Sequence, residues 1–380
     1  MDTAQEAREL HKKLRGKTEV VLKQDIQTKA DLALVYTPGV GVVSADIGVD
    51  VEKVWEYTGR GNMVAVISDG SAVLGLGDLG PEAALPVMEG KCALFKRFAN
   101  INAVPLVIDA HEVDDIVRVV KALAPSFGAI NLEDISAPRC FEIEERLKAE
   151  LSIPVMHDDQ HGTAIIVLAG LINAARVVGK ELSTLRVVVN GVGAAGVATM
   201  RLLTQAGVKS LIAVDSTGIV SVKRADLTAE KKKLVDDHIV LGDLSGTLDD
   251  ALAGADVFIG VSKGNILTAS HIQKMNPGAI IFGLANPVPE IMPDVALNAG
   301  AAIVATGRSD FPNQINNVLT YPGVFRGALD GRLPRITDAM KIAAARALAS
   351  LVEQPTAELI IPDVFDERVV PTVAAAVRGA

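Results

Sequence analysis

Short aliphatic runs alternate with stretches of helical spacing along the first half of the chain. The runs at residues 63–67, 103–108 and 129–132 are each followed by a polar or acidic residue. Residues 81–98, between the first two runs, have helical spacing, and Pro81 is suited to open that helix. Because strands that alternate with helices form βα units, the pattern predicts a parallel sheet covered by helices.

The second half repeats this alternation around a strand at residues 186–190. Residues 162–178 are apolar almost all round, which is typical of a helix buried between other elements. We therefore predict an α/β protein of two domains, residues 1–158 and residues 159–380, with C-terminal helices in the second. Further strands are expected at residues 211–214, 257–261, 279–282 and 303–305, and further helices at residues 197–206, 336–351 and 1 to about 30.

Composition supports this fold class and narrows the partners. Of 380 residues, 49% are hydrophobic and 3% aromatic, so aliphatic cores are expected, as in parallel sheets covered on both faces. A net charge of −9 without a basic tract argues against nucleic-acid binding. We expect no signal peptide and no membrane span. Two cysteines, Cys92 and Cys140, are too few for a disulfide framework and favour a reducing, cytoplasmic location.

A glycine-rich turn follows the strand at residues 186–190 and precedes a helix. Its first glycine permits the tight turn, its second lets the backbone approach a pyrophosphate, and its third lets helix and strand pack closely. The helix N-terminus adds unpaired N–H groups for the phosphates. In this context the turn predicts a Rossmann-type dinucleotide site made by Gly191, Val192, Gly193, Ala194, Ala195 and Gly196.

Asp215 ends the next predicted strand, 24 residues after Gly191. A carboxylate at this place can accept hydrogen bonds from the adenosine ribose, which favours NAD. Lys223 and Arg224 follow slightly downstream and could instead contact the 2′-phosphate of NADP. The sequence therefore favours NAD and leaves NADP open.

Two acidic pairs, Glu133–Asp134 and Asp158–Asp159, each follow an aliphatic run that resembles a strand. Strand ends of a parallel sheet meet at its ligand-binding edge, and carboxylates that converge there repel one another unless a cation neutralises them. Oxygen ligands favour Mg²⁺ or Mn²⁺ over zinc. The alternative is that each pair caps a following helix. For the neighbouring His157 and His161 we expect structural or hydrogen-bonding roles.

Six short motifs add a resemblance to these physical arguments. They are Tyr36-Thr37-Pro38-Gly39, Gly75-Leu76-Gly77-Asp78-Leu79-Gly80, Glu89-Gly90-Lys91, Asn131-Leu132-Glu133-Asp134, His157-Asp158-Asp159-Gln160-His161-Gly162-Thr163 and Asn316-Asn317-Val318. In this order, over about residues 32–329, they resemble the motifs of malic enzymes of the compact bacterial type. The resemblance implies NAD(P)-dependent oxidative decarboxylation of (S)-malate to pyruvate and CO₂ by a metal-dependent oxidoreductase. It also implies decarboxylation of oxaloacetate as a side activity.

The same resemblance implies three catalytic roles. Tyr36 would be the general acid, since a tyrosine can protonate the enolate carbon and stay neutral beforehand. Lys91 would be the base that removes the proton of the C2 hydroxyl, for which its pKa has to be lowered. Asp158 would lie behind Lys91 and position it.

Metal and substrate ligands are implied in the same way. Glu133, Asp134 and Asp159 would hold the metal ion. Two amides, Asn286 and Asn317, would bind the substrate carboxylates, because an amide donates hydrogen bonds without adding a charge. Lys91 is the third implied substrate-binding residue. Asn316 could exchange roles with Asn317.

One position departs from the family pattern. Larger malic enzymes carry a carboxylate-binding arginine just after the turn that is Asp69–Gly70 here, and in this chain Ala72 takes its place. Arg308 is a candidate substitute, and a salt-bridged structural arginine is the alternative.

Two other functions stay open at the level of sequence. One is a metal-dependent 2-hydroxy-acid dehydrogenase that does not decarboxylate, and the other is a non-catalytic nucleotide-sensing module. The resemblance further implies a homodimer or a larger homo-oligomer. It leaves open whether Tyr36 acts in its own subunit or in that of a neighbour.

Overall fold

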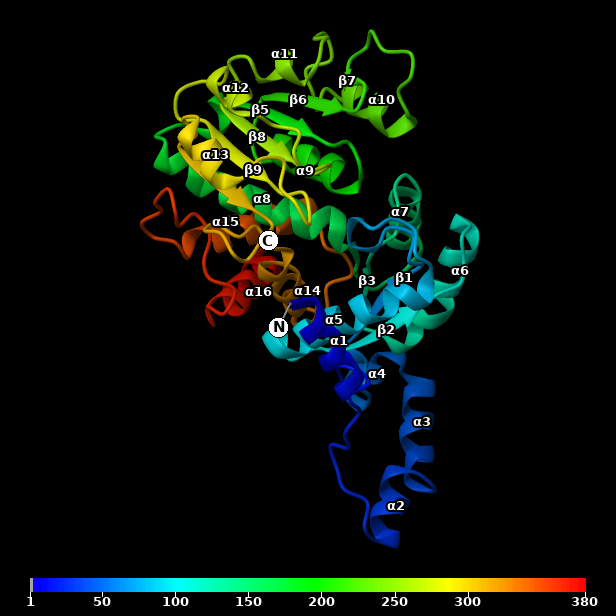
Figure 1. Cartoon of the computed structure of the whole chain (residues 1–380). Helices are drawn as coiled ribbons and strands as arrows, with labels where there is room; N and C mark the ends of the chain where they lie inside the picture. Colours follow the sequence, from blue (N-terminus) through cyan, green and yellow to red (C-terminus); the bar gives the residue numbers. More distant parts are fainter. Residues whose placement is uncertain (1–2) are drawn as a thin grey trace.

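A computed structural model of the chain describes residues 3–380 and places the strands in two separate sheets (Figure 1). The first sheet is parallel throughout and has the order β2 (Asn102–Val107), β1 (Met63–Ser68), β3 (Ala129–Leu132) and β4 (Val155–His157). It carries the helices α5 (Pro81–Ala99), α6 (Val113–Leu123) and α7 (Arg139–Glu150).

Both faces of this sheet are covered, which explains its continuous aliphatic strands. Val64 and Val66 of β1 join one core with side chains of α5, while Ala65 and Ile67 join another with side chains of α6 and α7. A strand that is buried on both sides has to be apolar at every position. The predicted parallel sheet is therefore confirmed, and α5 begins at Pro81 as predicted.

The second sheet contains the predicted dinucleotide-binding strands. Its order is β10 (Ile303–Thr306), β9 (Ile280–Gly283), β8 (Val257–Gly260), β5 (Arg186–Asn190), β6 (Ser210–Asp215) and β7 (Gly218–Ile219). All neighbouring strands in this sheet are parallel except β6 and β7, which are antiparallel. The sequence did not predict the short strand β7. Its helices are α9 (Ala194–Gln205), α10 (Ala229–Asp236), α11 (Leu248–Leu252), α12 (Ala269–Gln273) and α13 (Pro293–Asn298).

One long helix, α8 (Asp158–Val177), lies between the two sheets (Figure 1). It is buried along most of its length and packs against α9 and α15 (Asp338–Ser350). It begins four residues earlier than predicted, so the Asp158–Asp159 pair forms its first turn. The other helices at this level are α14 (Tyr321–Asp330), which packs on α5, and α16 (Val369–Gly379), which packs on α14 and α15.

The N-terminal segment departs from the prediction. Helix α1 (Thr3–Leu14) ends at Leu14, because Arg15 and Gly16 have positive φ angles of 54° and 121°. The prediction of a polar helix to about residue 30 is therefore wrong beyond α1. Two further helices, α2 (Lys29–Val35) and α3 (Gly39–Val49), pack on each other and extend away from both sheets (Figure 1). A short helix, α4 (Val54–Tyr57), leads back to the first sheet.

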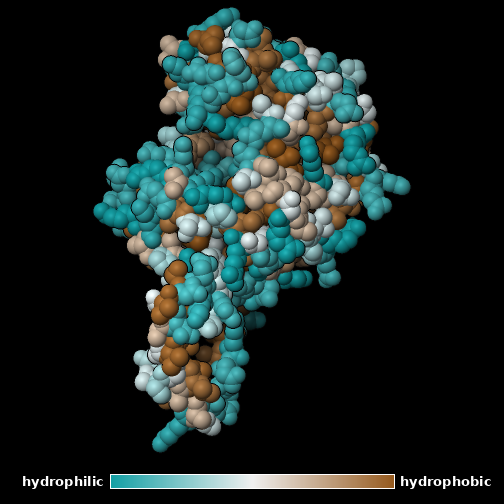
Figure 2. Space-filling view, turned by 180° about the vertical axis from the view of Figure 1, so that it is seen from behind, coloured by the Kyte–Doolittle hydropathy of each residue, from teal (hydrophilic) through white to brown (hydrophobic). Residues whose placement is uncertain are grey.

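We call residues 29–49 the arm. None of its residues is buried, and many of its exposed side chains are apolar, as Figure 2 shows on the projection below the main body. By length and composition alone, the arm is also the one stretch among residues 3–380 that could cross a membrane. Within the arm, however, the chain forms two helices separated at residues 36–38.

Candidate active site

Acidic side chains lie at the edge of the first sheet where β1, β3 and β4 end. Ile67 is in register with Leu132, and Leu132 with His157, so the residues that follow reach one edge together. These are Glu133 after β3 and Asp158 after β4. The edge lies where the strand order reverses, between β1 and β3, which is the usual ligand site of such sheets.

Lys91 reaches this edge from α5. Its Nζ lies 2.7 Å from Glu133 Oε1 and 2.7 Å from Asp158 Oδ2. Asn317, at the start of a 3₁₀ turn before α14, donates through Nδ2 to the same Asp158 oxygen at 2.6 Å. Lys91, Glu133 and Asp158 are all buried. The structure thus brings together four residues that the sequence analysis named from distant motifs.

Burial and charge determine the protonation of this cluster. Burial works against the Lys91 ammonium, but Asp158 and Glu133 outweigh it and hold the pKa of Lys91 well above its usual value. Burial also raises the pKa of Asp158, and burial with the neighbouring carboxylates raises the pKa of Glu133 well above its usual value. With only protein groups around it, Lys91 is therefore a buried cation. To act as a base it needs a lower pKa, which requires that the negative charge of the neighbouring carboxylates be neutralised.

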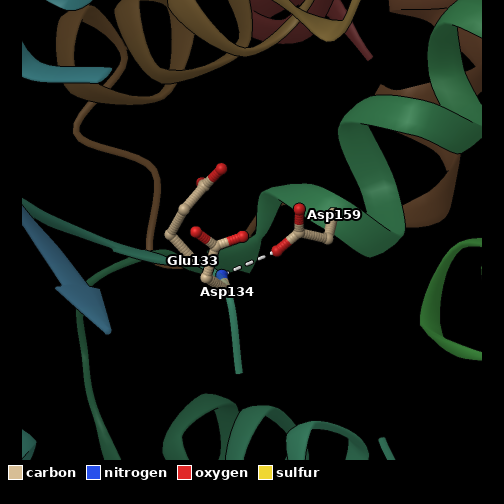
Figure 3. Close-up of side chains that lie close together, drawn as sticks. All are labelled: Glu133, Asp134 and Asp159. Carbon is tan, nitrogen blue, oxygen red and sulfur yellow. Dashed lines mark hydrogen bonds between the residues drawn. The ribbon is translucent and has the colours of Figure 1, made fainter. Parts of the chain in front are cut away.

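The three predicted metal ligands lie close together, with Glu133 and Asp134 after β3 and Asp159 in the first turn of α8 (Figure 3). One of them, Glu133, also pairs with Lys91. One oxygen from each carboxylate lies within 4.8 Å of the others. Asp159 Oδ2 accepts a hydrogen bond from the Asp134 backbone N–H at 2.8 Å. Asp134 Oδ2 is buried and has no hydrogen-bond partner among the described residues. Burial and Asp159 raise the pKa of Asp134 to about 7.

This arrangement fits a divalent cation. Carboxylates this close repel one another, and a buried oxygen without a partner is costly unless something binds it. An oxygen-only donor set of this kind suits Mg²⁺ or Mn²⁺. The alternative of helix capping is not supported, because the N-cap of α8 is His157 without a side-chain cap hydrogen bond and no helix begins directly after Glu133–Asp134. Asp158 and Asp159 do lie in the first turn of α8, where negative charge is favourable.

The amides differ in what they contact. Asn317 belongs to the Lys91 cluster, whereas Asn316 Oδ1 accepts a hydrogen bond from the Val318 backbone N–H at 3.0 Å and caps the 3₁₀ turn. The structure thereby separates the two residues that the sequence left interchangeable. Asn286 lies exposed in the loop after β9 and makes no hydrogen bond with any part of residues 3–380.

Tyr36 is not brought to this cluster within the chain. It ends α2 on the arm and is 66% exposed, while Lys91 is buried in the main body. A different tyrosine, Tyr321 of α14, lies under Lys91, with Nζ 4.2 Å from its ring centroid. Sequence reasoning missed Tyr321, although it follows Asn317 by only four residues, because nothing local distinguishes it from a core aromatic residue.

The glycine turn borders a cavity of about 630 Å³, which is lined by residues at the ends of strands β5, β6 and β8. A Cβ on Gly191, whose φ is +115°, would lie 2.7 Å from Val261 O, and one on Gly196 would lie 1.8 Å from Gly191 O. A Cβ on Gly193 would meet nothing within 4 Å. The first and third glycines are thus required by packing, and the second leaves space for a ligand. Val192 lines the cavity, and Ala194 and Ala195 open α9.

Asp215, the last residue of β6, also lines this cavity. Arg224 Nη1 donates to its Oδ1 at 2.7 Å, and Lys231 Nζ donates to its Oδ2 at 2.6 Å. Burial works against the carboxylate charge, but these two cations outweigh it and lower the pKa of Asp215 to about 2. Arg224 and Lys231 are not among the cavity-lining residues, and Lys223 is exposed elsewhere. Lys263 is the cation that lines the cavity among the described residues.

Arg308 and His161 make contacts of a structural kind, whereas the His157 ring lies beside a proposed metal ligand, with Nε2 3.7 Å from Asp159 Oδ2. Both sides of the Arg308 guanidinium pair with Asp310, at 2.8 and 2.7 Å, as in a salt-bridged surface arginine. His161 Nε2 lies 2.9 Å from Glu144 Oε2. His157 is fully buried, and neither of its ring nitrogens has a hydrogen-bond partner in the described chain.

Two family models match the chain one after the other. Residues 15–148 match "Malic enzyme, N-terminal domain", and residues 160–379 match "Malic enzyme, NAD binding domain". The first range contains Lys91, Glu133 and Asp134, and the second contains the glycine turn.

Individual proteins are similar over the whole chain. A bifunctional malic/malolactic enzyme of Bacillus subtilis is 52% identical over 382 residues, covering 100% of this chain and 93% of that protein. An NADP-dependent malic enzyme of Rhizobium meliloti is 48% identical, covering 100% of this chain and 52% of that protein. The crystal structure of an NAD-dependent malic enzyme from Thermotoga maritima has a TM-score of 0.95 at 49% identity, covering 98% of this chain and 99% of that one.

Proposed function

The chain belongs to the malic enzyme family, and from this premise we propose how its own residues oxidise and decarboxylate malate to pyruvate. The observation that carries the proposal is the position of Lys91 between Glu133 and Asp158, beside three converging carboxylates. A dinucleotide cavity in the same chain completes the set of groups that the reaction needs. The enzyme is an NAD(P)-dependent oxidoreductase.

We propose that Glu133, Asp134 and Asp159 hold Mg²⁺ or Mn²⁺. The buried, unpartnered Asp134 Oδ2 and the raised pKa of Asp134 support this assignment. A bound divalent cation supplies a Lewis acid for the C2 oxygen of malate, and the dinucleotide supplies the hydride acceptor. The side activity of decarboxylating oxaloacetate would use the same carboxylate cluster without the dinucleotide.

Lys91 is proposed to accept the proton of the C2 hydroxyl. Its Nζ is fixed between two carboxylates, so it points to one position and cannot rotate freely. Because Glu133 holds the pKa of Lys91 up, neutralising the charge of Glu133 lowers that pKa toward the value that a base needs. Asp158 remains to orient the amine, and Asn317 fixes Asp158 from the other side. Asn317 and Asn286 are proposed to donate hydrogen bonds to the two carboxylates of malate.

We propose NAD as the preferred cofactor. Asp215 faces the cavity where the adenosine ribose is expected, and the paired cations keep it ionised. An ionised carboxylate accepts hydrogen bonds from ribose hydroxyls and repels a 2′-phosphate. Arg224 and Lys231 are already occupied by Asp215, so neither is free to attract that phosphate. Similar proteins include both an NAD-dependent and an NADP-dependent malic enzyme. We therefore propose that NADP is also accepted, with a lower kcat/KM than NAD.

We further propose that the enzyme is a homodimer or a larger homo-oligomer and that Tyr36 protonates the enolate in the site of a neighbouring subunit. Tyr36 makes no contact with Lys91 in its own chain, and it lies on an arm whose apolar side chains are exposed. An apolar surface of this kind is typical of a surface that is covered by a partner. Two buried free thiols, Cys92 and Cys140, are consistent with the cytoplasmic location we propose.

Mixing two inactive variants tests the placement of Tyr36. Tyr36→Phe and Lys91→Ala are each expected to be inactive alone. If Tyr36 acts in a neighbouring subunit, dimers re-formed from an equal mixture recover about a quarter of the sites with both residues intact. If Tyr36 acts within its own subunit, the mixture stays inactive. Two copies of Lys91→Ala taken through the same procedure are the control.

An initial-rate assay tests the function itself. Malate with NAD and Mn²⁺ is expected to yield pyruvate, CO₂ and NADH in equal amounts, with a lower kcat/KM for NADP and no turnover in EDTA. Lactate is measured as well, because the Bacillus subtilis relative is named a malic/malolactic enzyme. Oxaloacetate that accumulates without pyruvate would instead identify a non-decarboxylating dehydrogenase. NAD binding without turnover under any of these conditions would indicate a sensing module.

A further inference from the structure

A buried carboxylate outside the reaction site, Glu144 of α7, holds both ends of the segment that carries Asp158 and Asp159. Its Oε1 accepts a hydrogen bond from the His157 backbone N–H at 2.9 Å. Its Oε2 lies 2.9 Å from His161 Nε2 and 3.4 Å from Gln160 Nε2. Because the two carboxylate oxygens bind on either side of Asp158 and Asp159, Glu144 fixes the turn from which both side chains project.

The orientation of His161 is fixed from its other side as well. Lys341 Nζ, on α15, lies 3.0 Å from His161 Nδ1, and Asp338 pairs with the same ammonium at 2.9 Å. An ammonium group only donates hydrogen bonds, so Nδ1 accepts and Nε2 carries the proton that His161 donates to Glu144. A continuous polar chain therefore runs from α15, which packs on α8, to the turn at residues 157–161.

Fixing a turn in this way is costly, which indicates that its position matters. Glu144 is only 4% exposed, and burial of a charge is unfavourable unless partners offset it. Burial works against the Glu144 carboxylate, but His161 and Lys148, whose Nζ is 2.7 Å from Oε1, outweigh it and hold the pKa of Glu144 well below its usual value. A Leu would fill the same space without this cost, but it could not bind the His157 N–H. Networks that are fully paired hold a single geometry.

We propose that Glu144 is a positioning residue for the reaction. By holding the turn at residues 157–161 it sets the place of Asp158 against Lys91 and of Asp159 against Glu133 and Asp134. Glu144 does not contact the substrate. This inference rests on the proposed function only for the roles of Asp158 and Asp159 in positioning Lys91 and binding the metal ion. The contacts by which Glu144 holds the turn do not depend on that function.

Glu144→Gln tests the proposal with little change in volume. The amide that replaces one carboxylate oxygen can only donate, so either the His157 N–H or the His161 Nε2–H loses its acceptor. We expect the Kd for Mn²⁺, measured without substrate by calorimetry or electron paramagnetic resonance, to rise about 10- to 100-fold, as for other residues that orient metal ligands. At saturating Mn²⁺ we expect kcat to fall, whereas the Kd for NAD stays unchanged because the glycine turn lies in the other sheet.

The neighbouring Glu145 provides a matched control. It lies on the same helix but is exposed, so Glu145→Gln removes one charge and leaves the turn untouched. Its Mn²⁺ affinity and kcat are expected to equal those of the wild type. Glu144→Asp keeps the charge on a shorter side chain and is expected to recover part of the lost Mn²⁺ affinity.

Two results would overturn the proposal. One is a folded Glu144→Gln variant with wild-type Mn²⁺ affinity and kcat. The other is a parallel loss of Mn²⁺ and NAD affinity with a lowered melting temperature, which would reduce Glu144 to a general contributor to stability. If Glu144→Gln does not fold, Lys341→Met takes its place, because it removes the donor to His161 Nδ1. A Mn²⁺ Kd at least about threefold higher with unchanged NAD affinity supports the chain of contacts, and an unchanged Mn²⁺ Kd refutes it.

These measurements separate this inference from the proposed function. Mn²⁺ and NAD binding are read without turnover, so they report on the turn even if the wild-type protein does not convert malate. Failure of the wild-type assay would overturn the function alone. Failure of the binding comparison would overturn the role of Glu144 alone.

Discussion

Lys91 Nζ lies 2.7 Å from oxygens on two different elements, so a small displacement of either one changes its environment. Catalytic groups lose much of their effect when they move by about 1 Å. Substitutions of residues that set these distances without reacting should therefore affect activity as strongly as substitutions of the reacting groups. Gly162 on α8 is one such residue, because it packs directly against Asp158.

Gly162→Ala is expected to disrupt the Lys91 cluster. The added Cβ would lie 1.9 Å from Asp158 Oδ1 and 3.2 Å from Asn317 Cβ, so Asp158 has to move. We expect kcat/KM for malate to fall about 100-fold in steady-state assays, with the Kd for NAD unchanged. Gly170→Ala on the same helix is the control, since the atoms nearest to its Cβ would be the ends of the Ile315 and Phe282 side chains, at 3.0 and 3.4 Å. Equal effects of the two changes would contradict this explanation.

Asp215→Asn is expected to weaken the preference for NAD. The amide carries no charge to repel a 2′-phosphate, and Arg224 and Lys231 lose the carboxylate that occupies them. A hydrogen bond to a charged group contributes about 1.5 kcal/mol or more, so the ratio of kcat/KM for NAD to that for NADP should fall about tenfold. Asp226→Asn is the matched control, because Asp226 also pairs with Arg224 but does not line the cavity. An unchanged ratio in Asp215→Asn would show that the ribose is bound elsewhere.

At the level of elements, the sequence predicts what local pattern determines. The strands of both sheets are aliphatic because both of their faces are buried. The glycine turn is recognisable because it follows a strand and precedes a helix, which is the context that a dinucleotide site requires. The sequence also predicts that the acidic pairs at Glu133 and Asp158 follow strands, because each comes after an aliphatic run, and in the structure they follow β3 and β4. The bounds of α8 were less accurate, since its first turn is acidic and lies outside the apolar stretch.

Other features depend on contacts between distant segments, and the sequence could not predict them. The position of Tyr321 under Lys91 depends on how α14 packs against α5, and the Glu144–His161 contact depends on α7 lying beside the start of α8. The different contacts of Asn316 and Asn317 likewise follow from the packing of distant segments and not from local pattern. The sequence did not predict the two helices of the arm. Their apolar residues are not buried within the chain, so they do not form the one-sided apolar pattern of a helix that packs on a core.

Val42→Lys on α3 is expected to weaken self-association. Val42 is 68% exposed in the single chain, and an ammonium group buried there without a partner would cost well over about 1.4 kcal/mol, a tenfold change in the dissociation constant. Sedimentation equilibrium should show smaller species at concentrations where the wild type is associated, and activity should fall with them. Val222→Lys, at a position 66% exposed in the second sheet region, is the control. An assembly that survives Val42→Lys would show that the arm is not its interface.

On the scale of the whole molecule, the two proposed ligands bind to different sheets. The carboxylate cluster lies at the edge of the first sheet, and the dinucleotide cavity lies at the edge of the second. Helix α8 joins them, since its first turn carries Asp159 and its length packs against α9, which follows the glycine turn. Each ligand should therefore stabilise the protein through its own residues.

The carboxylate cluster provides a test of this separation by thermal unfolding. Mn²⁺ removes the repulsion among Glu133, Asp134 and Asp159, so at about 100 times its Kd it should add about 2.7 kcal/mol to the free energy of unfolding and raise the melting temperature, and EDTA should reverse the shift. NAD should raise the melting temperature independently. In the double variant Glu133→Gln, Asp134→Asn the shift with Mn²⁺ should disappear while the shift with NAD remains. In Asp215→Asn the increase in melting temperature with Mn²⁺ should equal that of the wild type. A Mn²⁺ shift that persists in the double variant would place the cation elsewhere, because those two residues supply most of the charge that draws it to this edge of the sheet.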